Sequence, residues 1–221
     1  MDKFKTISTM LLALLLIASV AYFTIPDPRI NITSNKFIEA LISDTNPEDY
    51  CTGEVLYRVS TRQTTASEVI SVNSSVIDSS RNFARVYIIA EMRLEAGVDV
   101  GFYEAELIKE DGWKVYALRE TMPRVDSFSL PGKPDVGSVY EKSFSELSQG
   151  DISSLAGAAR TAYKPQVGVK GEISNLQTNV LFNNKLVVAK HSYVYDGRLV
   201  KVLAHYYMTS EGYKIVAIQA I

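Results

Sequence analysis

The sequence predicts an α+β protein made of two similar units in tandem, each with an N-terminal helix and a short helix packed on an antiparallel sheet of about four strands. Three observations carry this prediction. The stretch EDGWKV at residues 110–115 returns as SEGYKI at residues 210–215. Helical patterns precede strand patterns in both halves, and a segment rich in proline and glycine separates them. The composition, 47% hydrophobic and 22% charged, is that of a globular chain able to bury a core.

The N-terminal segment, residues 1–30, is typical of an export signal. Lys3 and Lys5 precede an apolar run at residues 10–25, which ends at a Pro-Asp-Pro stop. A helix of roughly 16 residues spans about 24 Å, whereas a membrane anchor usually has about 20. An uncleaved anchor and a signal peptide cleaved after Ala21 both stay open, as does a buried helix of the fold. The two lysines predict that the bulk of the chain lies outside the cytoplasm, either as a single-pass protein of the cell membrane or, after cleavage, as a secreted one.

The first unit is predicted at residues 34–125. Its helix, SNKFIEALISD, has Ser34 or Asn35 as its cap and carries an apolar face. A short helix follows at about residues 49–59. From residue 84 onward, apolar and polar side chains alternate with the period of a strand that has one buried and one wetter face. The apolar helix positions are Phe37, Ile38, Leu41 and Ile42, and the alternating apolar strand positions are Ala84, Val86, Ile88, Ala90, Met92 and Leu94.

Residues 126–136 form the predicted linker, because their prolines and glycines sustain neither a helix nor a central strand. The second unit, residues 137–221, repeats the order of the first. Its helix presents Val139, Tyr140, Phe144 and Leu147, and a short helix is expected at residues 152–163. Asn183-Asn184 and Asp196-Gly197 mark hairpins.

When the sequence is aligned with itself at an offset of one hundred residues, the two units match at several positions, not only in the EDGWKV and SEGYKI turns. We therefore expect the units to pack on each other, with Trp113 and Tyr213 in equivalent positions. The aligned pairs are Gly97 with Gly197, Gly112 with Gly212, Trp113 with Tyr213, Lys114 with Lys214, Val115 with Ile215 and Ala117 with Ala217.

This element order and the DGWKV turn resemble the NTF2-like (cystatin-like) superfamily, over both halves from Ser34 to Ile221. The resemblance implies a curved antiparallel sheet that wraps the long N-terminal helix of each unit. With a membrane anchor in front, the chain also looks like the VirB8 and TcpC class of conjugation-channel components. That likeness implies an assembly role in the cell envelope.

The residues that most often hold metals are sparse. If Asp196-Gly197 is a two-residue turn, His191 lies opposite Val202 and His205 opposite Val188, so the two imidazoles point to opposite sides of the sheet. This arrangement argues against a shared metal site. The single cysteine, Cys51, excludes an intramolecular disulfide and is expected to be a small buried hydrophobe. No metal and no cofactor is predicted.

Catalytic motifs are also missing from the sequence. Phosphate-binding glycine loops, GxSxG and HExxH do not occur. The NTF2-like resemblance implies that an enzyme of this kind would place a polar group inside the cone between helix and sheet. Glu104 or Glu106 in the first unit and His191 or Tyr206 in the second are the candidates, but none belongs to a known catalytic set. The sequence therefore predicts a protein that is not an enzyme.

Charge divides unevenly between the units. Residues 34–122 contain 15 acidic and 9 basic residues, a net charge of −6, whereas residues 136–221 contain 6 and 9, a net charge of +3. This difference favours docking on a second copy or on another envelope protein, although a merely solvated surface would show it too. The basic residues are too scattered to predict nucleic-acid binding.

Two functions follow from the sequence. The first is a membrane-anchored, extracytoplasmic, non-catalytic module for interaction or assembly with envelope or membrane proteins, itself included. The alternative is a binding protein for a small apolar or amphipathic molecule, held in the cone of one unit. Its candidate ligand pocket contains His191, Tyr193 and Tyr206, with Tyr195 and Tyr207 as further lining residues.

Overall fold

The computed structural model describes residues 26–61, 67–95, 97–123, 136–148, 151, 153–162, 171–179, 185–195 and 197–221. In the first half the elements are α2 (Pro28–Ser43), η1 (Pro47–Tyr50), α3 (Gly53–Ser60), β1 (Glu68–Ser79), β2 (Phe83–Leu94), β3 (Gly97–Lys109) and β4 (Trp113–Glu120). In the second half they are α4 (Gly137–Ser148), α5 (Gly157–Ala162), β5 (Gly171–Asn179), β6 (Leu186–Tyr195), β7 (Arg198–Thr209) and β8 (Gly212–Ala220).

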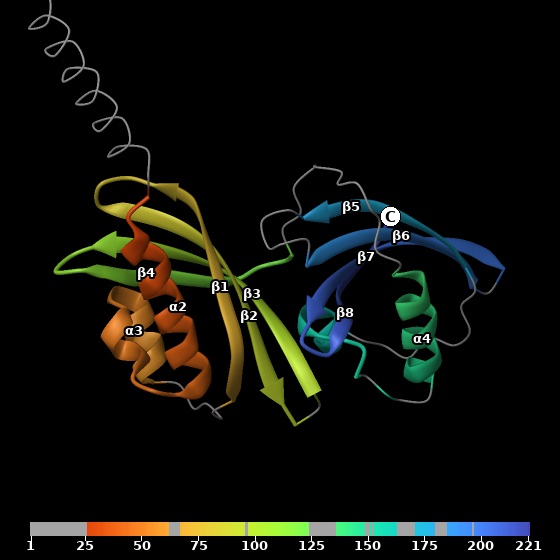
Figure 1. Ribbon diagram of the computed structural model, residues 1–221, viewed down its shortest axis with the longest axis horizontal. Helices are drawn as coiled ribbons and strands as arrows, with labels where there is room; N and C mark the ends of the chain where they lie inside the picture. Colours follow the sequence, from red (N-terminus) through yellow and green to blue (C-terminus); the bar gives the residue numbers. More distant parts are fainter. Residues whose placement is uncertain are drawn as a thin grey trace, which may run out of the picture.

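Each half contains a four-stranded antiparallel sheet whose strands pair in chain order, β1-β2-β3-β4 and β5-β6-β7-β8. Figure 1 shows the two sheets next to each other, with α2 and α3 on the far side of the first sheet and α4 on the far side of the second. The predicted α+β class, with helices packed on antiparallel sheets, is confirmed.

Helix α2 begins at Pro28, earlier than the sequence pattern predicted. Asp27 caps the helix by accepting a hydrogen bond from the backbone N–H of Arg29 at 3.0 Å, and Pro28 occupies the first turn, where its missing N–H costs nothing. Ser34, expected as the cap, is buried inside the helix, where its hydroxyl donates to the carbonyl of Ile30 at 2.8 Å. The Pro-Asp-Pro motif starts a helix here, and the expectation that it only ends the leader was wrong.

The predicted leader falls almost wholly on residues 1–25, which lie outside the described residues, as does most of the predicted linker, residues 124–135. Within the described ranges, none of the helices has both the length and the apolar character needed to cross a membrane.

The two halves repeat the same local contacts around their last hairpins. Val115 of β4 forms a parallel bridge with Cys51, and Ile215 of β8 forms one with Leu155. Trp113 and Tyr213 each follow the glycine of their hairpin, as expected. The other aligned glycines do not correspond: Gly97 opens β3, whereas Gly197 lies inside the β6–β7 turn.

One face of each sheet packs on its own helices. The first core joins α2 and α3 to the inner face of β2, β3 and β4 and includes Phe37, Ile38, Val55, Ala84, Val86, Ile88, Leu107 and Trp113. Cys51 is buried in this core, as expected from the sequence for a lone cysteine that acts as a small hydrophobic residue. The second core joins α4 and α5 to Val187, Ala189, Ala204, Tyr206 and Ile215. Burying one such large apolar side chain contributes about 1.5–3 kcal/mol.

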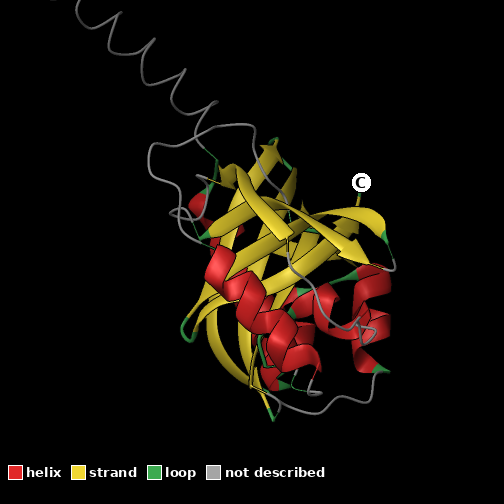
Figure 2. Ribbon diagram, turned by 90° about the vertical axis from the view of Figure 1, so that its right-hand side faces the viewer, coloured by secondary structure: helices red, strands yellow, loops and turns green. Residues whose placement is uncertain are grey.

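A third apolar cluster joins the two sheets through their opposite faces, and we call it the sheet–sheet joint. Tyr87, Ile89, Val100 and Phe102 of the first sheet contact Ala156, Leu186, Tyr207 and Val216 of the second half. The ring of Phe102 meets the ring of Tyr207 edge-on, with centroids 6.0 Å apart. Figure 2 looks from the right-hand side of Figure 1, so the strands of the two sheets overlap in that view. The layers are therefore helix, sheet, sheet and helix.

Candidate functional site

Three aromatic rings form a buried polar cluster between α4 and the second sheet. The rings of Tyr140, on α4, and His191, on β6, stack with centroids 3.7 Å apart and an interplanar angle of 9°. The hydroxyl of Tyr206, on β7, lies 2.7 Å from Nε2 of His191. Both His191 and Tyr206 are fully buried, so this hydrogen bond is shielded from water. We call these three residues the ring cluster.

Burial keeps the ring cluster uncharged. It lowers the pKa of His191 to about 4 and raises the pKa of the Tyr206 hydroxyl far above its usual value. If the Tyr206 hydroxyl donates to Nε2, the proton of the neutral imidazole sits on Nδ1. That buried atom has no hydrogen-bond partner among the described residues. A ligand or water that brings an acceptor atom would satisfy it.

The first half has only apolar side chains at the corresponding positions. Leu107 pairs with Ala84, and Ile88 lies four residues further along β2. In the second half Tyr206 pairs with Val187, and His191 lies four residues further along β6. Ile88 and Leu107 are both fully buried in the first core. The polar groups of the ring cluster are therefore a property of the second half.

The structure brings together two of the three residues of the predicted ligand pocket, His191 and Tyr206. The backbone of Tyr193 pairs with Val200 on β7, while its side chain, like that of Tyr195, lies outside the described residues. Tyr207 was expected in the same pocket, but it lies on the other face of the sheet, in the sheet–sheet joint. Tyr140 was not identified as a candidate, because in the sequence it is one more apolar position of a helix.

The strand register predicted from the Asp196-Gly197 turn is confirmed, with His191 opposite Val202 and His205 opposite Val188. The two imidazoles therefore belong to opposite faces of the sheet. Burial also lowers the pKa of His205, and a hydrogen bond with the backbone of Ala217 raises that pKa part of the way back. Among the described residues, no group of histidine, cysteine, aspartate and glutamate side chains is arranged to hold a metal ion.

The two candidate carboxylates of the first unit, Glu104 and Glu106, do not lie inside the cone. Between them Ala105 is buried in the first core, so the two carboxylates point to the opposite face of the sheet. Glu106 accepts a hydrogen bond from the hydroxyl of Tyr116 at 2.7 Å. Strand alternation already favoured the wetter face for any one of these carboxylates.

A polar pocket of about 380 Å³ opens on that outer face, next to the sheet–sheet joint. Glu104 lies between two arginines, with Oε2 2.8 Å from Nη2 of Arg119 and Oε1 3.7 Å from Nε of Arg85. The hydrogen bond from Arg119 to Glu104 raises the pKa of that guanidinium. The charged side chains that line the pocket are therefore two arginines, Arg85 and Arg119, and one glutamate, Glu104.

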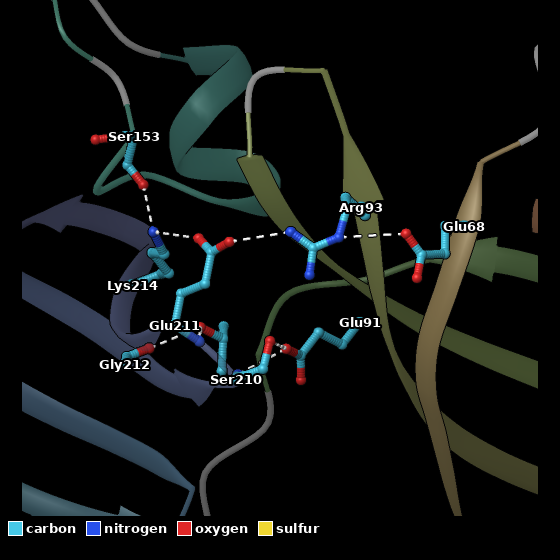
Figure 3. Close-up of polar contacts among 9 residues, drawn as sticks. Glu68, Glu91, Arg93, Ser153, Ser210, Glu211, Gly212 and Lys214 are labelled. Carbon is cyan, nitrogen blue, oxygen red and sulfur yellow. Dashed lines mark hydrogen bonds and ion pairs between the residues drawn. The ribbon is translucent and has the colours of Figure 1, made fainter.

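Polar contacts continue the sheet–sheet joint at one end (Figure 3). Arg93 of β2 bridges two carboxylates, with Nε 3.3 Å from Oε2 of Glu68 in the first half and Nη1 3.2 Å from Oε1 of Glu211 in the second. Glu211 also pairs with Lys214 at 3.2 Å, and Lys214 donates to the carbonyl of Ser153 at 2.7 Å. These contacts run from β1 across both sheets.

Two carboxylates of the first half accept backbone N–H groups of the second half. Glu91, only 3% exposed, accepts both the N–H and the hydroxyl of Ser210, at 2.7 and 2.6 Å. Asp99 accepts the N–H of Gly157, the first residue of α5, at 2.5 Å. A carboxylate at a helix N-terminus is favourable because it satisfies a free N–H and faces the positive end of the helix dipole. The joint therefore combines apolar packing with directed hydrogen bonds that fix how the two halves meet.

A second cluster fixes the start of α2 to the hairpin between β3 and β4. The carboxylate of Asp27 accepts hydrogen bonds from the Arg29 side chain, at 2.7 to 3.1 Å, and from the indole N–H of Trp113, at 3.1 Å. The bond with Arg29, helped by that with Trp113, holds the pKa of Asp27 well below its usual range. Lys109 lies 3.9 Å from the same carboxylate. Asp27, which lies near the end of the predicted leader, is therefore tied to the folded unit.

Comparisons with known proteins found similarity to solved structures. No family model matches the sequence, and no curated protein matches it. A solved structure described as an "Ntf2 like protein involved in plasmid conjugation" is similar, with 12% sequence identity over 86% of this chain and 95% of that chain and a TM-score of 0.32. At this identity and TM-score, the likeness assigns neither a family nor a function to this chain.

Proposed function

We propose that this chain is a membrane-anchored, extracytoplasmic, non-catalytic interaction module built from two tandem NTF2-like units. The order of helix, short helix and four antiparallel strands in each half supports the tandem units, as do the repeated contacts around the last hairpins. The apolar run after Lys3 and Lys5 supports the anchor and its orientation.

The observation that carries the interaction role concerns the opposite net charges of the two units. The ion pair across the sheet–sheet joint does not neutralise them. Within the described residues, the ion pair across the joint links Arg93, from the acidic unit, to Glu211, from the basic unit. Here the acidic unit contributes the positive charge and the basic unit contributes the negative one. The pair therefore neutralises neither the excess negative charge of the first unit nor the excess positive charge of the second. The net charges of −6 and +3, counted over residues 34–122 and 136–221, are therefore not compensated by this ion pair. Units of opposite net charge in one chain favour oriented association with charged partners.

The test is cross-linking of the anchored protein in its native membrane, followed by mass spectrometry of the captured proteins. A charge-reversal variant, Glu110→Lys with Asp111→Lys, changes an exposed acidic hairpin of the first unit. Lys201→Glu is the counterpart variant, since it reverses an exposed charge on the second unit. We expect a reproducible partner whose capture falls in one of these two variants and not in the other. Absence of any captured protein from a well-expressed sample would contradict the proposal.

A second function, binding of a small apolar or amphipathic molecule, is favoured by the ring cluster. Its three aromatic rings are buried together, and Nδ1 of His191 is a polar group without a hydrogen-bond partner among the described residues. Such a combination is common in ligand sites. Native mass spectrometry of the purified chain tests this function. A bound mass that disappears in Tyr206→Phe would support it, and a ligand-free spectrum together with a cone filled by side chains would exclude it.

A further inference from the structure

Strand β8 forms one edge of the second sheet, and only part of that edge is covered within the described residues. At Ile215 the N–H donates to the carbonyl of Ser154, and the carbonyl accepts the N–H of Ala156, both at 2.9 Å. These bonds close the edge where α5 begins. Beyond Ile215 the described residues place no further backbone partner on this edge.

The remaining edge presents backbone groups in a known direction. The N–H of Ile221 donates to the carbonyl of Lys201 on β7, so the backbone groups of residue 221 point inward. Because these groups alternate along an antiparallel strand, those of Ile218 and Ala220 point away from the sheet. Residues 217–220 therefore offer two N–H and two C=O groups to a further strand.

The side chains of β8 along this edge are uncharged, and the exposed charge of Lys201 lies on the neighbouring strand, beside Ile221. Three exposed side chains here are apolar. Ile218 is 42% exposed, Ile221 56% and Leu199, on the neighbouring strand, 63%. The matching segment of β4 carries two charges, Arg119 and Glu120, which protect an edge against pairing. Residues 215–221 contain no charged residue.

We propose that residues 217–220 of β8 pair with the same residues of a second copy of this chain. An antiparallel edge is self-complementary under a two-fold axis, and an uncharged edge does not repel its own copy. In the register centred on Gln219, Ile218 of one copy exchanges hydrogen bonds with Ala220 of the other, and all four outward groups are satisfied. The two four-stranded sheets then become one eight-stranded sheet, in which Ile218 and Ile221 each lie beside a strand of the other copy. The inference rests on the proposed anchoring, because four hydrogen bonds form a weak contact unless a membrane concentrates the copies.

The register predicts one specific cross-link. Gln219 faces Gln219 of the second copy at a position that is not hydrogen-bonded, where Cα atoms lie about 4.5 Å apart. Disulfides span about 4.4 to 6.8 Å between Cα atoms. The only native cysteine, Cys51, is 4% exposed in the core of the first unit, so it does not compete.

The experiment is oxidation of full-length Gln219→Cys in membranes, followed by non-reducing gel electrophoresis. The matched control is Arg119→Cys, the corresponding exposed position on β4. We expect a disulfide-linked dimer from Gln219→Cys and about tenfold less from the control. Adding Ile218→Lys should lower the dimer yield by a similar factor, whereas Ile218→Val should preserve it. The emission spectrum of Trp113 checks that the first unit of each variant remains folded.

Equal yields from Gln219→Cys and Arg119→Cys would overturn the proposed pairing, as would a yield that Ile218→Lys leaves unchanged. If another envelope protein is captured but the Gln219 cross-link does not form, the self-pairing proposal is refuted and the proposed interaction function is supported. The Gln219 cross-link without any other captured protein would support self-pairing and limit the interaction role to copies of this chain.

Discussion

Replacing Gly157 by alanine is expected to disrupt the sheet–sheet joint. Gly157 has a positive φ of 54°, and a Cβ atom there would lie 2.5 Å from the carbonyl oxygen of Val100 on β3. The carbonyl belongs to the backbone of a central strand, so it cannot move aside as a flexible side chain would. Relief requires the two sheets to separate, and this would also lengthen the bond from Gly157 to Asp99.

The first unit supplies the matched control, Gly53. Gly53 also begins a short helix and has a positive φ of 60°, but a Cβ atom there would meet nothing within 4 Å. Both alanine variants therefore carry the left-handed backbone penalty of about 1 kcal/mol, which is partly offset by reduced freedom of the unfolded chain. Only Gly157→Ala adds overpacking, typically 1–3 kcal/mol, and weakens a charged hydrogen bond. We expect Gly157→Ala to cost about 2–4 kcal/mol more than Gly53→Ala.

Urea unfolding of the full chain in detergent, followed by circular dichroism and by Trp113 fluorescence, measures this difference. Trp113 is the only tryptophan and lies in the first core, so its emission reports on the first unit alone. In Gly157→Ala the unfolding followed by circular dichroism should begin at lower urea than the unfolding of the tryptophan environment. Equal destabilisation by Gly53→Ala and Gly157→Ala would show that the close approach to Val100 does not exist.

Three further predictions concern the other clusters. Because burial lowers the pKa of His191 to about 4 while an unfolded histidine titrates near 6.5, the stability from neutral His191 is complete above pH 6.5 and is lost as pH falls toward 4, by at most about 1.4 kcal/mol per pH unit. In urea titrations from pH 7 to 5, His191→Phe should reduce this slope, and an unchanged slope would contradict the burial of a neutral imidazole. Glu91→Gln and Ser210→Ala, combined in a double-mutant cycle, should show a coupling of about 1 kcal/mol, whereas strictly additive costs would mean that the buried contact is not formed. Asp27→Ala should cost about 1 kcal/mol through loss of the helix cap and should shift the emission of Trp113, whose indole loses its partner; an unshifted spectrum would exclude that hydrogen bond.

The pairing of β6 with β7 could be predicted from the sequence because it depends on local chemistry. Asp196-Gly197 favours a two-residue turn, and once the turn is placed each residue's partner follows by counting. The register of His191 with Val202 was obtained in this way and is confirmed. The helices were found by the spacing of their apolar residues, although the start of α2 was missed because Pro28 was taken as a break.

The sequence could not predict which strand face would be buried by which neighbour. Tyr207 was expected among the residues lining the pocket of the second unit, but it lies on the opposite face of the sheet. Glu104 and Glu106, named as candidates for the inside of the first unit, also lie on the face away from the helices. Alternation divides a strand into two faces without saying which one meets the helix. Here both faces of β7 are buried, one by α4 and the other by the first sheet, so hydrophobicity did not distinguish them.

The sequence by itself therefore determined the α+β class, the order of elements in each half, the register of the β6–β7 hairpin and the uneven charge of the two halves. Each of these depends on residues close together in the chain or on simple counting. Only the tertiary structure decided the ring cluster and the sheet–sheet joint. Tyr140 and His191 are about fifty residues apart in the sequence, and Glu91 and Ser210 more than a hundred. Such contacts depend on how two sheets and two helical layers pack in three dimensions, which no local pattern records.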